Sequence, residues 1–221
     1  MIEYLPEIFK PQGLRTISRL ALYVDFIKTE KTIYWNYGTY GDQIETDYNA
    51  GCWDVSKDKI HDVHERVAGY SAKVDPVRQK APFLEKSTHQ GRHDCKVRRG
   101  NCEPEPERVY ELLMDNTFEI RYMLCRPGQD FLFEKVREKN DFSMGYISAK
   151  VQTDIDPELQ LFVRAFAAEY RLHFAELDIL YHENRPYIID VNNIAGCWRL
   201  FAKCDEPKFA KELYIKQVKS L

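Results

Sequence analysis

The sequence predicts an α+β protein with antiparallel sheets, and three observations lead to this fold class. Two apolar strand patterns, Ala175–Leu180 and Tyr187–Val191, flank a short polar turn, as in a hairpin. A second pair of strand patterns, Phe118–Cys125 and Phe131–Val136, flanks a turn that contains Pro-Gly. An amphipathic helix that opens at Asp156 lies between the two pairs. Strands joined by short turns run antiparallel, so we expect antiparallel sheets with separate helices.

Composition limits the classes of partner. A chain of 221 residues is long enough for one large core or two lobes, and its net charge of −3 gives no general attraction to nucleic acid or to an anionic membrane. No apolar run approaches the roughly 18 residues that a spanning helix needs, and the first residues carry no signal-peptide pattern. We therefore expect a cytoplasmic protein that binds neither nucleic acid nor membrane. The six cysteines contain no Cys-x-x-Cys pair, so we expect reduced thiols.

The first third of the chain predicts two helices and a strand. Apolar residues at helical spacing predict a helix over Leu14–Lys28, and a β-branched and aromatic run predicts a strand over Thr32–Tyr40. A short helix is predicted over Asp58–Tyr70. His61 and His64 could share a face of that helix, but a metal site would need a third ligand. We interpret them as solvated or capping histidines.

A polar loop between two short strand patterns is the first feature with chemical content. Phe83–Lys86 and Cys95–Arg99 flank the loop Ser87–Asp94, which contains one glycine, several hydrogen-bonding side chains and cations. Such a loop could hold a phosphate chain, and Lys86 stands just ahead of it. It is not a Walker loop, because the Gly-Lys-Ser/Thr ending is absent. Taken alone, the loop favours a surface hairpin with a solvated basic tip.

A Pro- and Glu-rich linker, Gly100–Glu107, is followed by a strand pattern over Val109–Met114. This strand is predicted to lie between two lobes, where its backbone could meet the edge of a base. Three cations, Arg121, Lys135 and Arg137, lie on or beside the next pair of strands. They could neutralise a transferring phosphoryl group, or they could form an ordinary solvated face.

The helix after Asp156 is predicted to pack under the sheet that carries the last hairpin. Its apolar stripe consists of Leu159, Phe162, Val163, Phe166, Ala167 and Tyr170. A terminal helix is expected within Glu206–Leu221.

The last hairpin carries three hard oxygen ligands. Asp178 interrupts its first strand, and Asp190 and Asn192 lie two residues apart on the second, so they share a face. Carboxylate and amide oxygens suit Mg²⁺ or Mn²⁺. An acid in an apolar strand is costly unless it is paired or bound to a metal. The alternative is that Asp190–Asn193 is a turn after a strand.

The order of these motifs resembles the ATP-grasp superfamily. Its members carry a metal-binding acid on one strand and an acid-x-Asn pattern on the next, as in Glu176–Asp178 followed by Tyr187–Asn193. Further similar stretches occur in the same order, and the match covers about residues 50–200. These stretches are Phe83–Ser87 before the loop, Tyr110–Leu112, Ile120-Arg121 and Lys135–Arg137.

The resemblance implies an ATP molecule held between two α+β lobes with antiparallel sheets, with Mg²⁺ or Mn²⁺ bridging its phosphates. It implies that Asp178, Asp190 and Asn192 bind the metal. The nucleotide would be bound by Lys73, Lys86, Ser87, Tyr110, Glu111 and Leu112, with Lys86 at the phosphates and the backbone of Glu111 and Leu112 at adenine. Arg121, Lys135 and Arg137 would face the γ-phosphate and the acceptor as catalytic residues.

The activity implied is that of an ATP-dependent carboxylate–amine ligase. Most ATP-grasp enzymes convert a carboxylate to an acyl phosphate, which an amine or thiol then attacks, so the protein mainly positions groups and stabilises charge. The alternatives are a kinase on the same fold, or a catalytically silent relative that binds nucleotide or a protein partner. A ligase needs two co-substrates besides ATP and a kinase only one.

Three features depart from the family pattern. Ala195-Gly196 stands where Pro-Gly is usual, the loop holds a single glycine, and about 50 residues precede the match instead of a domain. We therefore expect a short segment over 1–50, a small nucleotide-covering lobe over 51–108 and a metal- and phosphate-binding lobe over 109–221. A second copy or a partner protein could supply the missing domain. The acceptor is expected to be a small molecule or a peptide.

Overall fold

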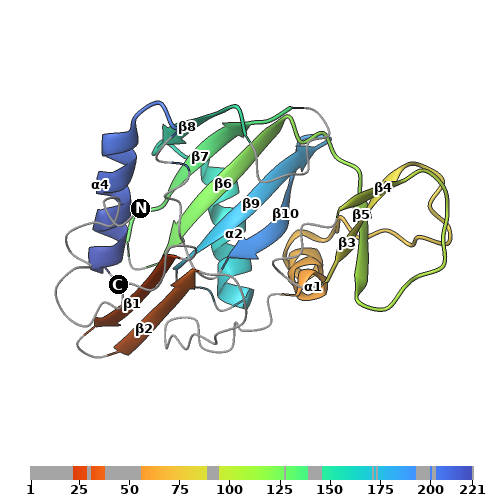
Figure 1. Ribbon diagram of the computed structural model, residues 1–221, viewed down its shortest axis with the longest axis horizontal. Helices are drawn as coiled ribbons and strands as arrows, with labels where there is room; N and C mark the ends of the chain where they lie inside the picture. The colour runs from red at the N-terminus through yellow and green to blue at the C-terminus, as the bar shows by residue number, and fades with distance from the viewer. Residues whose placement is uncertain are drawn as a thin grey trace.

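In the residues that it describes, the computed structural model of the chain contains three antiparallel sheets (Figure 1). No helix in the described part is long and apolar enough to cross a bilayer. The structure describes residues 22–28, 31–37, 56–88, 95–126, 128–138, 146–170, 172, 174–192, 200 and 203–220.

The largest sheet has five strands in the order β10-β9-β6-β7-β8, and every neighbouring pair is antiparallel. Both predicted strand pairs are confirmed within it. β8 has no predicted counterpart, because Ala149 and Val151 are its two buried apolar residues and give too short a pattern. The strands are β6 (Phe118–Cys125), β7 (Phe131–Val136), β8 (Ser148–Gln152), β9 (Phe174–His182) and β10 (Arg185–Asn192).

One face of this sheet forms the main apolar core. Helix α2 (Pro157–Tyr170) lies behind the sheet in Figure 1, as predicted, and α1 (Lys57–Ala68) packs beside it against β10. The α2 helix begins where the Asp156 carboxylate accepts from the Glu158 and Leu159 N–H groups, at 2.7 and 3.4 Å. The core includes Ile60, Val63, Val163, Phe166, Leu177, Ile179, Ile188 and Val191.

The hairpin turn between β9 and β10 is shorter than the predicted five residues. Glu183 and Asn184 alone form it, with φ of 50° and 61°. A two-residue turn with both φ positive matches the twist of its strands, and Asn adopts such values readily. As a result Pro186 belongs to β10, where it pairs with Tyr181.

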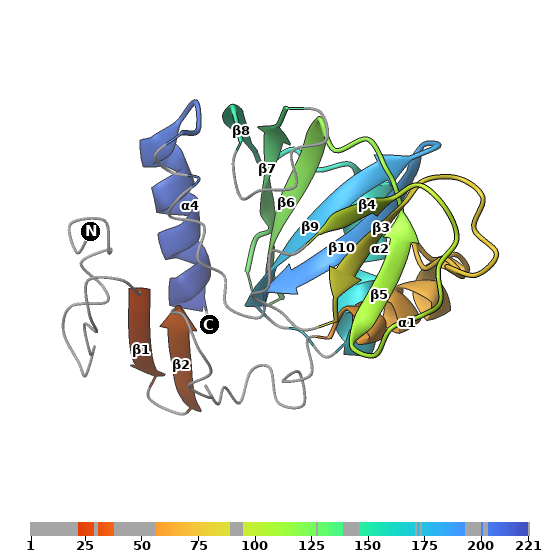
Figure 2. The ribbon, with the colours of Figure 1, turned by 45° about the vertical axis from the view of Figure 1, so that its right-hand side comes forward.

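A second, small sheet has the order β4-β3-β5 and contains β3 (Phe83–Ser87), β4 (Lys96–Arg98) and β5 (Arg108–Leu112). The strand predicted between the lobes therefore belongs to this sheet. Residues 72–74 run along its outer edge, where Leu112 N donates to Ala72 O at 2.8 Å. The turned view shows this sheet in front of β9 and β10 (Figure 2).

The predicted helix over Leu14–Lys28 is wrong where the chain is described. Leu22–Lys28 is strand β1, which pairs with β2 (Lys31–Tyr37). Strand β2 confirms the strand predicted over Thr32–Tyr40. The β1 sequence contains Tyr, Val, Phe and Ile, which favour strands, and pairing with β2 overrides a helical spacing.

The predicted terminal helix is confirmed as α4 (Pro207–Ser220). Its Gln217 side chain donates to Met123 O at 2.9 Å and to Gln129 O at 2.7 Å, which fastens the helix to the β6–β7 end of the large sheet.

Candidate functional site

A β-bulge in β10 aims the predicted metal ligands away from the core. Ile188 pairs with Ile179 on the core face, and the register then shifts so that Asp190 pairs with Asp178. An unshifted strand would place Asp190 on the core face, two residues after Ile188. The extra residue, Ile189, turns Asp190 and Asn192 to the opposite face. The predicted convergence of three oxygen-bearing side chains on one face is confirmed.

The same face carries a tight ion pair between β6 and β9. Arg121 donates from Nε to Asp178 Oδ1 at 2.7 Å and from Nη2 to Oδ2 at 2.8 Å, and its Nη1 reaches Glu176 Oε2 at 3.2 Å. Burial alone would raise the pKa of the Asp178 carboxyl, but Arg121 and Lys135 hold that pKa well below its usual range. Asp178 is therefore ionised and fully paired.

Lys135 and Arg137 extend this charged row toward β7. Lys135 is 1% exposed and forms ion pairs with Glu119 and, at 3.5 Å, with Asp178 Oδ1. Arg137 Nε lies 2.7 Å from Glu119 Oε2. The three cations predicted to be catalytic therefore lie together, each paired with one or more of three carboxylates. We missed Glu119 and Glu176, although each stands two residues before a predicted site residue and so shares its face.

Asp190 and Asn192 fit Mg²⁺ better than Asp178 does. Mg²⁺ typically takes one or two protein oxygens together with phosphates and waters. Lys57 Nζ contacts Asp190 Oδ1 at 2.7 Å, whereas Arg121 occupies both Asp178 oxygens. In the described part of the chain, no three His, Cys, Asp or Glu side chains gather as a metal site. Asp178 could join the metal only if Arg121 turned away.

Lys57 is a candidate site residue that sequence reasoning missed. It is the first residue of α1, and its partner Asp190 is 133 residues away, so no local pattern indicates the pair. Burial alone would lower the pKa of Lys57, but Asp190 and Glu111 raise it well above the ordinary value. Lys57 is therefore a cation that interacts with a carboxylate of the large sheet and one of the small sheet.

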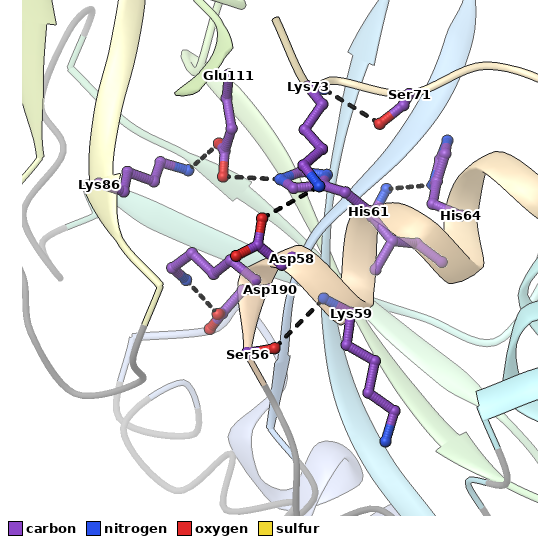
Figure 3. A network of polar contacts seen from close by, with 12 residues as sticks. Ser56, Asp58, Lys59, His61, His64, Ser71, Lys73, Lys86, Glu111 and Asp190 are labelled. Carbon is purple, nitrogen blue, oxygen red and sulfur yellow. Dashed lines mark hydrogen bonds and ion pairs between the residues drawn. The ribbon is translucent and has the colours of Figure 1, made fainter. Parts of the chain in front are cut away.

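A second charged cluster lies where α1 meets the small sheet (Figure 3). Glu111 is fully buried, its Oε1 lies 3.0 Å from His61 Nε2, and its Oε2 forms an ion pair with Lys86. Burial alone would raise the pKa of Glu111, but Lys86, His61 and Lys57 hold it well below its usual range. Lys86 is thus placed at the boundary between the small sheet and α1.

Of three other predicted nucleotide residues, Lys73 pairs with Glu111 on the face of Lys86 but is engaged by α1, and Ser87 and Tyr110 lie on the other face. The Lys73 ammonium contacts Asp58 and Asp62 of α1, at 3.1 and 3.2 Å. Strand alternation places Ser87 and Tyr110 on the sheet face opposite Lys86, since Ser87 follows Lys86 directly and Tyr110 pairs with Glu85.

The backbone predicted to meet adenine is partly engaged by the protein itself. The Leu112 N–H already bonds Ala72, and the Leu112 side chain packs against a cluster that includes Met114 and Leu180. Most of the predicted phosphate loop (residues 89–94) and the Ala-Gly departure (within residues 193–199) lie outside the described residues.

The interpretation of His61 and His64 as solvated or capping residues is wrong. Each is 1% exposed. His64 accepts from the Ile188 N–H at 3.4 Å and stacks on Tyr187. The two rings therefore connect α1 to different neighbours, His61 to the small sheet and His64 to β10.

No protein-family model and no curated protein matches the chain. Solved structures do match. The ligase PsnB, complexed with a phosphomimetic variant of its minimal precursor, Mg and ADP, aligns with a TM-score of 0.53 at 14% identity over 77% of this chain. The chain has an ATP-grasp-like fold. It spans 61% of the length of PsnB.

Two other ATP-grasp-like neighbours were also solved with peptides. The macrocyclase MdnC from Microcystis aeruginosa MRC, bound with the precursor peptide MdnA, aligns with a TM-score of 0.50 at 10% identity over 76% of this chain and 58% of its own. A RiPP-associated ligase from Chryseobacterium gregarium, in complex with ADP and a leader and core peptide, aligns with a TM-score of 0.50 at 11% identity over 76% of this chain and 60% of its own.

Proposed function

We propose that this protein is an ATP- and Mg²⁺-dependent ligase that joins a carboxylate to an amine. The observation that carries the proposal is the meeting of charges from both lobes on an ATP-grasp-like fold. Lys86 and Lys57 approach from the small sheet and α1, while Arg121, Lys135 and Arg137 lie on or beside the large sheet. Cations that approach from two sheets suit a polyphosphate chain.

In this proposal Lys86 and Lys57 bind the phosphates of ATP, and Asp190 and Asn192 hold Mg²⁺. The metal would neutralise charge that develops on the transferring phosphoryl group. When ATP binds, the Arg121 guanidinium moves from Asp178 to the γ-phosphate. This exchange is feasible because a guanidinium binds a carboxylate or a phosphate through two N–H donors. Asp178 then gains free oxygens that can complete the metal site.

The proposed reaction has two displacements. A substrate carboxylate oxygen attacks the γ-phosphorus, the bond to the β–γ bridging oxygen breaks, and ADP leaves. An amine nitrogen then attacks the acyl carbon, loses a proton, and expels inorganic phosphate. In this proposal Lys135 and Arg137 stabilise negative charge in both steps, since burial strengthens such interactions.

A peptide is the acceptor class that we propose first. The PsnB structure contains a variant of its minimal precursor, the MdnC structure a precursor peptide, and the C. gregarium structure a leader and core peptide. A small-molecule acceptor is the alternative. A panel of free amino acids and acidic peptides distinguishes the two, because ADP release will rise with the true class.

The primary test is Mg²⁺-dependent ATP binding by isothermal titration calorimetry. The unmodified chain should bind ATP with Mg²⁺ and much less without it. Asp190→Asn combined with Asn192→Ala should weaken Mg²⁺-dependent binding at least tenfold, about 1.4 kcal/mol. Asp154→Asn, at an exposed carboxylate ahead of α2, is the control and should bind as the unmodified chain does. Absence of ATP binding by the unmodified chain would overturn the proposal.

A catalytically silent nucleotide binder is the second candidate, and one observation favours it. The three large-sheet cations are already matched by Asp178, Glu176 and Glu119, so no unpaired cation among them awaits a phosphoryl group. ATP binding without ADP release, across all carboxylate and amine pairs, would favour the silent binder. ADP release with a single hydroxyl substrate would indicate a kinase.

A further inference from the structure

We infer that His61 is a positioning residue, which holds Glu111 so that Lys86 can turn to the phosphates of a nucleotide. The inference deepens the proposed function and rests on the nucleotide site described there. It assigns a role to a buried histidine that neither the predicted motifs nor the proposed ligand set includes.

The geometry divides one carboxylate between two partners. Glu111 Oε1 faces His61 Nε2 at 3.0 Å, and Oε2 faces Lys86. The three residues come from different elements, β5, α1 and β3, as Figure 3 shows. Each partner therefore holds one oxygen, and neither can take both without displacing the other.

The need for a second partner follows from the burial of Glu111. Its side chain is 0% exposed, so water cannot replace a lost partner. A buried carboxylate left without a partner destabilises a protein by several kcal/mol. If Lys86 were the sole partner of Glu111, moving its ammonium to a phosphate would incur that penalty. With His61 on Oε1 and Lys57 close by, Glu111 stays compensated while Lys86 moves.

His61 is fixed in place by the helix that carries it. Its neighbours Ile60 and Val63 are 0% and 1% exposed and belong to the core against the large sheet. The His61 ring is itself 1% exposed, and its Nδ1 has no hydrogen-bond partner among the described residues. The contact of Nε2 with Glu111 is therefore the polar interaction that explains a buried imidazole here.

His64 provides a matched control. It lies one turn further along α1, has the same 1% exposure, and also has a buried ring nitrogen without a partner in the described part of the chain. It accepts from the Ile188 N–H and contacts the rings of Tyr70, Phe162 and Tyr187. Replacing either histidine with Leu removes a buried imidazole, but only the change at His61 removes a partner of Glu111.

The first experiment compares nucleotide affinity among variants. His61→Leu should raise the Kd for Mg²⁺–ATP about tenfold, equivalent to 1.4 kcal/mol, by calorimetry below the melting temperature of each variant. His61→Gln should bind within a few-fold of the unmodified chain, because its amide nitrogen can reach the place of Nε2. His64→Leu should lower the melting temperature and leave the Kd unchanged. Equal affinity for His61→Leu and the unmodified chain would overturn the inference.

A double-mutant cycle tests the electrostatic reason. Glu111→Gln removes the charge that requires compensation, so it should recover part of the affinity that His61→Leu loses. A purely structural role for His61 predicts additive losses instead. Additivity within error would therefore also overturn the inference.

A second readout does not depend on nucleotide at all. Acetylation of Lys86 by acetic anhydride, followed by peptide mass spectrometry, should be several-fold slower in His61→Leu, because the carboxylate of Glu111 has then lost His61 and holds the ammonium more tightly. Lys135, 1% exposed in the other sheet, is the internal reference for loosening of the fold. If the unmodified chain fails to bind ATP, the proposed function fails, and the Lys86 rate still decides the inference. An unchanged rate would count against it.

Discussion

The two faces of the five-stranded sheet are built from alternate residues of the same strands, yet they are held in different ways. On one face Leu177, Ile179 and Val191 pack against α1 and α2. On the other, Asp178 and Arg121 form a bidentate ion pair within a row of matched charges. The apolar face is stabilised by the area that it buries and by its close packing. The charged face is stable only while each buried charge keeps its partner.

The two faces are expected to contribute differently to the stability of the protein. Replacing a buried ion pair with apolar residues is often neutral or stabilising, so pairs of this kind are weak evidence for a stability role. The proposed ligand site lies on the charged face, and the apolar face contributes mainly to folding. Removing one member of a charged pair should nevertheless destabilise strongly, because its partner remains buried.

The largest effect is expected for Arg121→Met. It leaves Asp178 and Glu176 without their guanidinium, and we expect a loss of about 4 kcal/mol in the free energy of unfolding, measured with urea at pH 7. Arg66→Met is the control, because the Arg66–Glu169 pair is half exposed and should contribute less than about 1 kcal/mol. Similar losses in the free energy of unfolding for the two arginine variants would show that the charged face does not depend on its ion pairs in this way.

Leu177→Ala tests the apolar face. Leu177 is fully buried, and its truncation should lower the free energy of unfolding by about 3 kcal/mol through lost contacts and a cavity. Nucleotide affinity, measured well below the melting temperature, should stay the same. Leu161→Ala, at a residue 74% exposed on α2, should change stability by less than about 0.5 kcal/mol. A large loss of affinity in Leu177→Ala would mean that the faces are not separable.

The pH dependence of stability should report on His64, at the edge of the apolar face. Burial, and to a smaller extent His61, lowers the pKa of His64 from 6.5 to about 4. The His64 side chain takes up a proton near pH 6.5 in the unfolded chain, but only near pH 4 in the folded chain. Stability is therefore complete above pH 6.5 and falls below it, by about 2 kcal/mol at pH 5.

Urea titrations at a series of pH values measure this slope. His64→Asn should remove it between pH 6.5 and 4 while keeping an acceptor near Nδ1. His182→Asn, at a partly exposed histidine near the hairpin turn, should retain the slope. A His64→Asn variant with an unchanged slope would assign the pH dependence to other groups.

The smallest effect is expected at Ser56, the N-cap of α1. Its side chain accepts from the Lys59 N–H at 3.3 Å, and Ser56→Ala should weaken the first turn by about 1 kcal/mol. Because Lys57 lies in that turn, nucleotide affinity should fall in parallel with stability. Ser71→Ala removes a comparable side-chain contact in a turn after α1 and should leave affinity unchanged. Equal affinity in both variants would show that Lys57 does not depend on the cap.

Local sequence patterns predicted the elements that local forces decide. The β6–β7 and β9–β10 pairs and α2 have clear periodicity and turn or cap residues, and all are present. The predicted helix ending at Lys28 failed because pairing between strands decided the outcome there. The predicted turn around Asn184 was too long. The ends of the two strands depend on hydrogen bonds between them, which cannot be inferred from the local sequence.

The candidate site was predictable in part for the same reason. Asp190 and Asn192 share a face through strand periodicity, which is a local property. Lys57 and His61 were missed as site residues because their partners lie 133 and 50 residues away. The carboxylate partners of the predicted cations also depend on register between strands, which no single segment specifies.

The extra residue in β10 makes the place of a gap more important than the identity of Ile189. Deleting Ile189 would join Ile188 directly to Asp190 and give a regular strand that keeps the pairs of Ile188 with Ile179 and of Asp190 with Asp178. Deleting Val191 instead would move Asn192 from the charged face to the core face. Among related sequences, we therefore expect gaps and apolar substitutions at Ile189 to be tolerated, and gaps at Val191 to be excluded.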